Sequence, residues 1–340
     1  MSTGPRVLEW LRTTLLQHDA QWVEATPRGF RWWPHQQAQT LEVIGQELGP
    51  DGAVVDLVQV RTALLRELDL DVEALEVLQA VALRTAGMAG PVYDAERRTL
   101  DLCSLARVSA ETAAWMQRLL GMAALLQLRD AWWGTAALTE ALGAVPAHSA
   151  HPVHGPRAEA DARIAEALVV IATEGRAPSR WAGEELERLA ETDLTCTPAL
   201  TGFGDERGFT VEFPHGADTA SLCEVATHQP HPWYGQGLAL RHRFPVTLTT
   251  PEAGWRLALE LNARALGQVP MGYGFGSFGY EADTLTFHAF LPNAIQQRGV
   301  VANLYRSCAE RARLLSVLLT GVDWTAESFD RGRSAMGRRL

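Results

Sequence analysis

The sequence predicts an α+β protein built from two copies of one domain. Residues 207–319 contain three strand-like runs, a helix, two more strand-like runs and a closing helix. Residues 1–130 show the same order, and short segments recur in it about 180 residues apart. These segments are Arg28-Gly29-Phe30 with Arg207-Gly208-Phe209, Gly87 with Gly267, and Thr99-Leu100 with Thr284-Leu285. We therefore expect two antiparallel sheets of about five strands, each with helices packed on one face.

The elements of the first copy follow from its apolar pattern. Residues 5–17 predict an amphipathic helix that lies across the first sheet. Runs of β-branched and aromatic residues, bounded by Gly and Pro, predict the strands. Strands are expected at 22–23, 29–33, 40–44, 53–65, 90–93 and 99–105. Helices are expected at 72–86 and 110–128, with 132–142 extending the second one.

The second copy has a clear helix start. Thr250-Pro251-Glu252 places a threonine at the N-cap, proline at the first helical position and an acid in the first turn. A helix is therefore expected over residues 251–265, and Gly267 stops it. Strands are expected at 209–213, 220–227, 238–246, 273–280 and 285–291. Further helices are expected at 158–175, 180–191 and 300–319.

The domain boundaries are set by a segment without periodicity. We expect a first domain at 1–145, a linker at 146–157, a second domain at 158–330 and a basic tail at 331–340. The linker contains His148, His151 and His154, but it has no carboxylate or thiolate among them. Because metal sites need rigidly held ligands, a solvated linker is the favoured interpretation.

Composition restricts the functional classes. The chain has 340 residues, a formal net charge of −10 and no lysine. Without a broad basic face, direct strong binding to nucleic acid is not expected. The four cysteines show no C-x-x-C spacing, so no disulfide framework is indicated. No cleavage site or long apolar segment occurs, so we expect a cytoplasmic protein with no membrane contact.

Two groups of residues invite a chemical interpretation. Gly274, Gly276 and Gly279 fit the G-x-G-x-x-G pattern, yet they follow a helix and lead into a strand, the reverse of a dinucleotide-binding unit. The neighbouring aromatic residues are instead expected to line a ligand-receiving surface. Potential metal ligands are densest in the second copy, and a zinc-dependent enzyme or sensor is the alternative hypothesis if the fold brings together His215, Cys223, His228, His231 and His242.

No catalytic motif supports the enzyme hypothesis. The sequence lacks a G-x-S-x-G elbow, an H-E-x-x-H helix and a phosphate-binding loop with its lysine. A core cysteine and loop histidines are the simpler explanation of the second group. We therefore predict no catalytic residue, no metal and no cofactor.

The order of helix, three strands, helix, two strands and helix in each copy resembles the fold of type III secretion chaperones and YbjN-like proteins, which bind peptides. The resemblance implies a non-enzymatic role in holding another protein and a pseudo-dimer within one chain, and it leaves homodimerisation open. The lysine-free, tryptophan-rich composition also resembles a deinococcal member of this class that binds DdrB. DdrB is a single-stranded-DNA-binding protein of the DNA-damage response.

We therefore predict a chaperone or adaptor that binds a protein partner, with a single-stranded-DNA-binding protein of DNA repair, such as DdrB, as the partner that the resemblance suggests. Large aromatic side chains bury much area at small entropic cost and are favoured binding anchors. The predicted partner-binding residues are Trp32, Trp33, Trp132, Trp133, Trp233, Tyr234, Tyr273 and Phe275.

Overall fold

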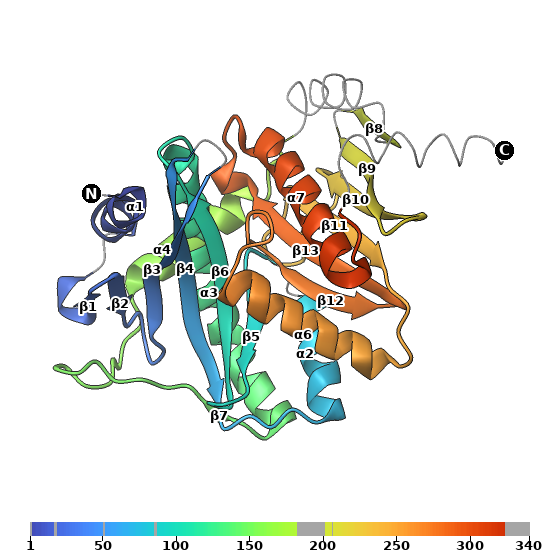
Figure 1. Cartoon of the computed structure of the whole chain (residues 1–340). Coiled ribbons are helices and arrows are strands. Elements are labelled where there is room, and N and C mark those ends of the chain that lie inside the picture. Colours follow the sequence, from blue (N-terminus) through green and yellow to red (C-terminus); the bar gives the residue numbers. More distant parts are fainter. Residues whose placement is uncertain are drawn as a thin grey trace.

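Two antiparallel sheets lie side by side, with helices packed against both (Figure 1). The computed structural model describes residues 2–16, 19–49, 52–84, 87–181, 201–205 and 207–323. The predicted α+β class and the antiparallel pairing are confirmed. Most of the helix expected at 180–191, together with Cys196 and the basic tail at 331–340, lies outside the described residues.

The first sheet has seven strands in the order β1-β2-β3-β4-β6-β5, and β7 pairs with β4. Its strands are β1 (Val23–Thr26), β2 (Gly29–Trp32), β3 (Gln39–Leu48), β4 (Val54–Arg66), β5 (Gly90–Asp94), β6 (Thr99–Val108) and β7 (Val145–Pro146). Its helical elements are α1 (Thr3–Trp10), a π-helical turn (Leu11–Leu15), a 3₁₀ turn (Ala20–Trp22), α2 (Val72–Arg84) and α3 (Ala113–Leu142). Short strands such as β7 raise the total above five because two residues are too few to give an alternating pattern.

The second sheet has six strands in the order β12-β13-β11-β10-β9-β8. Its strands are β8 (Thr201–Asp205), β9 (Gly208–His215), β10 (Thr219–Ala226), β11 (Gly237–Pro245), β12 (Ser277–Glu281) and β13 (Thr284–Pro292). Its helices are α4 (Ala162–Glu174), α6 (Pro251–Gly267), a 3₁₀ turn (Asn293–Ile295) and α7 (Val300–Thr320). Matched in chain order, β8 to β13 repeat the arrangement of β1 to β6.

Helix α6 begins as the sequence predicted. The Thr250 side chain accepts a hydrogen bond from the Ala253 backbone N at 3.3 Å, and Pro251 stands at the first helical position. At the other end the helix stops at Gly267. In the middle, Asn262 bonds to both the backbone N and O of Phe278, which lie on the free edge of β12. The helix thereby covers an edge that would otherwise be open to pairing.

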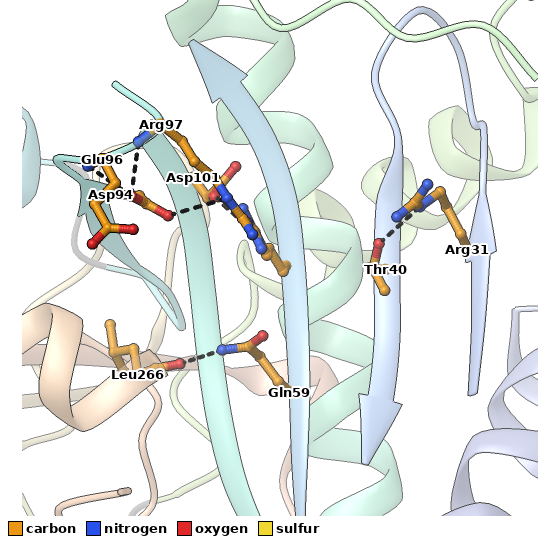
Figure 2. Close-up of polar contacts among 9 residues, drawn as sticks. Arg31, Thr40, Gln59, Asp94, Glu96, Arg97, Asp101 and Leu266 are labelled. Carbon is orange, nitrogen blue, oxygen red and sulfur yellow. Dashed lines mark hydrogen bonds and ion pairs between the residues drawn. The ribbon is translucent and has the colours of Figure 1, made fainter. Parts of the chain in front are cut away.

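The first sheet is covered on both faces, which corrects the expectation of helices on one face. On one side, Thr62 donates to Gln127 of α3 at 2.9 Å. On the other, Gln59 donates to the carbonyl oxygen of Leu266 at 2.8 Å (Figure 2). Gln59 and Thr62 point in opposite directions because strand side chains alternate. The second layer comes from α6, which belongs to the half of the chain that forms the second sheet. The apolar pattern of the first half alone therefore does not predict this layer.

The two halves cross each other through reciprocal contacts. The Leu105 backbone N donates to Gly274 O at 3.1 Å, and the Phe290 backbone N donates to Gly87 O at 3.0 Å. Leu105 and Phe290 occupy the same place in β6 and β13, counted from the first residue of each strand. Likewise, α6 packs on β5 and α2 packs on β12. Each half thus packs a helix and a loop against the strands at the edge of the other half.

The glycine-rich segment before β12 is a loop, whereas the sequence predicted a strand from residue 273. Gly272, Gly274 and Gly276 have φ values of 76, 66 and 126°, which lie outside the strand region. Consequently β12 begins only at Ser277. The segment leads into a strand and not into a helix, as the order of the sequence patterns indicated.

The segment expected to be a solvated linker, residues 146–157, is packed against the first sheet. Val145–Pro146 pairs with β4, and the buried His151 ring lies edge-on to Trp33 at 4.7 Å. Arg157 donates to the backbone oxygen of Trp33 at 2.8 Å. Burial of the His151 ring against tryptophan explains why this proline-rich segment takes a fixed path.

The contact between the halves predicts that alanine destabilises the protein far more at one glycine with a left-handed backbone than at another. A Cβ added to Gly274 would lie 1.7 Å from Leu105 O, whereas one added to Gly143 would meet nothing within 4 Å. We expect Gly274→Ala to lower the free energy of unfolding by about 2–5 kcal/mol and Gly143→Ala by about 1 kcal/mol. Urea denaturation measures both values. Equal losses would mean that the halves do not depend on this close approach.

Candidate functional site

A tight turn between β10 and β11 presents Trp233 to solvent. The His231 backbone N donates to Gly235 O at 2.8 Å, and the Gly235 backbone N donates to His231 O at 3.0 Å. Inside the turn, His231 Nδ1 accepts from the backbone N of Trp233 at 3.2 Å and of Tyr234 at 3.4 Å. Burial, helped by Arg129, lowers the pKa of His231 to about 4. The ring is therefore neutral at pH 7 and keeps its acceptor.

An arginine of α3 joins this turn to the first half. The Arg129 guanidinium carbon lies 4.1 Å from the Trp233 ring centre, 5.0 Å from that of Tyr234 and 5.7 Å from that of Trp133. These distances allow cation–π attraction to each ring. We call Arg129, Trp133, Trp233 and Tyr234 the arginine–aromatic cluster. Trp133 is 73% exposed and Trp233 46% exposed, so two large rings face solvent around one cation.

A buried carboxyl group anchors the cluster. The Tyr234 hydroxyl donates to Asp130 Oδ1 at 2.7 Å, and Arg129 donates to the same oxygen at 3.0 Å. Burial raises the pKa of Asp130 to about 6 against the opposing effect of both partners. Burial and the neighbouring Asp130 also raise the pKa of Tyr234 well above its ordinary value. The phenol therefore stays protonated and fixes the turn to α3.

A groove of about 490 Å³ adjoins the arginine–aromatic cluster. Its floor is formed by β10, β11 and β13, and the turn that carries Trp233 forms one wall. The charged and aromatic residues that line it are Glu224, Arg241, His231, His288, Trp233 and Phe290. Burial, with Arg241 and Arg243 nearby, lowers the pKa of His288 to about 4. At pH 7 the groove presents one acid, one arginine and two neutral imidazoles among apolar walls.

The predicted partner-binding aromatics divide into exposed and buried residues. Trp132, Trp133 and Trp233 are exposed, and Tyr273 is partly buried against Trp115. The assignment as partner-binding residues is corrected for the four buried side chains, which no partner at the surface can contact and which are Trp32, Trp33, Tyr234 and Phe275. Trp32 donates to Gln39 Oε1 at 2.9 Å and Trp33 to Ser149 Oγ at 3.1 Å, so a polar partner accompanies the burial of each indole.

A second hollow, of about 840 Å³, lies between α1 and the strands β1 to β3. Its charged lining includes Glu9 and Arg12, whose side chains pair with each other at 2.7 Å. The acid of the groove beside Trp233 is paired in the same way, because Glu224 forms an ion pair with Arg243.

The fold brings together only two of the five predicted metal ligands. Cys223 of β10 and His242 of β11 stand opposite each other in register, and Cys308 of α7 joins them. One possible ligand atom from each lies within 4.8 Å of the others. His215 is buried beside Phe244 instead, and the other two histidines, His228 and His231, belong to the segment that leads into the turn.

The pKa values of the two thiols in this cluster are shifted in opposite directions. Burial and the adjacent Cys308 raise the pKa of Cys223. Burial also acts to raise the pKa of Cys308, but the Cys223 thiol and the Arg311 guanidinium outweigh it and lower that pKa. Burial and Arg311 lower the pKa of His242 well below its ordinary value. The imidazole is thus neutral and able to donate a lone pair.

Comparisons with protein-family models, curated proteins and solved structures give no match. Within the described ranges, none of the helices has the length and apolarity needed to cross a membrane. We therefore infer function from the geometry of the groove, the arginine–aromatic cluster and the buried thiols.

One sequence signal could have drawn attention to the turn. The pattern His-Pro-x-x-Gly occurs at His151 and again at His231. In both turns the histidine Nδ1 accepts from the two backbone amides that follow proline, and histidine and glycine exchange backbone hydrogen bonds. Arg129 and Asp130 carried no such signal, because their role depends on contacts with a turn about 100 residues away.

The raised pKa of Asp130 predicts a pH dependence of stability. Between its ordinary value of 3.8 and its folded value of about 6, the folded state binds more protons than the unfolded state. The contribution of Asp130 to the free energy of unfolding is therefore fully present below about pH 4. It is lost as the pH rises to about 6. The loss is at most ~3 kcal/mol. Asp130→Asn should remove this dependence and gain stability relative to the wild type as the pH rises.

Urea denaturation at several pH values between about 4 and 7 measures the effect. Glu159→Gln, at an exposed position, controls for the loss of one negative charge. A constant difference between wild type and Asp130→Asn across this range would contradict the assigned pKa.

Proposed function

We propose that this chain is a non-enzymatic chaperone or adaptor that holds a segment of a partner protein in the groove beside Trp233. The observation that carries the proposal is the convergence of Trp133 and Trp233 around Arg129, because Trp233 also lines the groove. Partly exposed tryptophans next to a concave surface are the residues that most often dominate binding energy. Among the described residues that line the groove, none is serine, threonine, cysteine or lysine, so it holds no hydroxyl, thiol or amine nucleophile of these four types.

The partner segment that fits best is extended and carries an apolar or aromatic side chain. Pro230, Pro232 and Phe290 give the groove apolar walls, and an aromatic ring would pack against Trp233. Arg241 can donate to polar groups of the segment, and Glu224, which pairs with Arg243, keeps acceptor capacity on its carboxylate. Beyond the groove, the segment would reach Trp133, which is exposed and held on the same arginine.

Tandem duplication of a YbjN-like or secretion-chaperone-like domain belongs to the same proposal. The strand order that β1 to β6 share with β8 to β13 supports it, with β7 as an addition to the first sheet. So does the position of the recurring Arg-Gly-Phe segments: Arg28 O accepts from the Val43 backbone N at 2.9 Å, and Arg207 O accepts from that of Thr227 at 2.8 Å. The reciprocal bonds of Leu105 and Phe290 support a pseudo-dimer of two copies within one chain, as a self-complementary interface requires.

A single-stranded-DNA-binding protein of DNA repair, such as DdrB, is the partner that we propose to test first. This choice rests on the resemblance in composition and on the acidic net charge of −10, which disfavours direct binding to the DNA itself. A cytoplasmic location and homodimerisation in solution remain predictions. Light scattering at several protein concentrations distinguishes a monomer from a homodimer.

Substitution of Trp233 should weaken partner binding without unfolding the protein. Trp233→Ala removes a half-exposed ring, so we expect a loss of about 2 kcal/mol in binding, or roughly thirtyfold in Kd. Trp133→Ala should give a smaller loss because its contact with Arg129 is longer. Isothermal titration calorimetry with purified DdrB measures each value.

Val153→Ala is the matched control. Val153 occupies the position of Trp233 in the other His-Pro-x-x-Gly turn and is 79% exposed. It should leave Kd unchanged. If DdrB does not bind, crosslinking from native lysate with wild type, Trp233→Ala and Val153→Ala compared side by side tests the groove itself. Capture that is equal in all three would contradict the assigned site.

A further inference from the structure

The buried thiols of the second sheet lie next to a buried positive charge. Arg311 follows Cys308 by one turn of α7 and is 1% exposed. Its guanidinium carbon lies 3.6 Å from the Phe287 ring centre, and its NH1 atom lies 4.0 Å from Cys308 Sγ. In the described part of the chain it forms no ion pair with a carboxylate. A buried cation needs a compensating negative charge, because burial of an unpaired charge is costly.

The ligand atoms for a soft metal are already gathered beside that cation. Cys223, His242 and Cys308 are all fully buried and come from two paired strands and the helix that covers them. Ser221 Oγ lies 3.0 Å from His242 Nε2, which orients the ring. Nδ1 of the same ring has no hydrogen-bond partner among the described residues, so a polar atom is buried without a contact.

Charge and ligand number distinguish between the metals that thiolates prefer. Two thiolates, one imidazole and Zn²⁺ would make a neutral centre and leave the charge of Arg311 uncompensated. Zinc also takes four ligands in structural sites, whereas three donors converge in the described residues. Two thiolates, one imidazole and Cu⁺ make a centre of charge −1, which balances Arg311. Soft thiolate ligands select Cu(I), which accepts three-coordinate geometry.

We propose that Cys223, His242 and Cys308 bind one Cu(I) ion, with Arg311 compensating the negative charge of the centre. On binding, each thiol loses its proton to solvent, two sulfur–copper bonds form, and the imidazole donates a lone pair from Nδ1. The site lies within the second half and is separate in its ligands from the groove beside Trp233, so it does not depend on the proposed partner.

The copper content of the whole protein tests this proposal. Because the ligands are buried, the metal is supplied during folding: cells grown with added copper and zinc produce the untagged chain. Purification is anaerobic with bicinchoninate present to remove weakly bound Cu(I). We expect close to one copper per chain by mass spectrometry of the metals. Absence of copper, or zinc in its place, would overturn the assignment.

Substitutions identify the ligands. Cys308→Ser and Cys223→Ser should lower copper retention by at least about tenfold. Arg311→Met should also weaken retention, since it removes the compensating charge. Cys103→Ser is the control, because Cys103 is a buried cysteine of the first sheet outside this cluster. Retention equal to that of the wild type in both cluster cysteine variants would refute the site.

X-ray absorption at the copper edge supplies a readout that does not require folded variants. Two sulfur ligands and one nitrogen ligand around Cu(I) in the wild-type protein would support the proposed set. A shell of nitrogen and oxygen alone would contradict it, whatever the variants show.

Discussion

The reciprocal crossing of the two halves is the constraint on which the rest of the structure depends. A loop of each half accepts a backbone hydrogen bond from a strand of the other, Gly274 from Leu105 and Gly87 from Phe290. Because Gly274 lies so close to the Leu105 carbonyl, no side chain fits there without moving a strand. Helices α2 and α6 then pack at the junction, each against the edge strand of the opposite half.

The crossing also positions the candidate site. It fixes α3 of the first half beside the turn that carries Trp233 in the second half, so Arg129 and Asp130 reach rings that are remote in sequence. The buried Tyr234–Asp130 contact holds this arrangement, while Trp133 and Trp233 stay exposed above it. A rigid support beneath exposed aromatic rings reduces the entropy lost when a partner binds. The buried thiol cluster, in contrast, is built within the second half alone.

Local sequence patterns were sufficient for the fold class and most elements. The Thr250-Pro251 start of α6, the long α3 and the strand pair that ends in β13 are each specified by caps, apolar periodicity or β-branched runs within one segment. The sequence also indicated the order of elements that both halves share. Predicted and observed element boundaries differ where glycines adopt positive φ values, as in the glycine loop before β12. The sequence there alternates like a strand, but positive φ values are incompatible with one.

The sequence by itself determined the α+β class, the order of elements and the residue types available for binding, because each of these follows from interactions between neighbours along the chain. Only the tertiary structure decided which aromatics are exposed: Trp33 is buried and Trp133 is not, although both stand in Trp-Trp pairs. It alone joined Cys308 to Cys223 and Arg129 to Trp233. Such contacts depend on how helices pack across sheets, and packing of distant segments leaves no local period in the sequence.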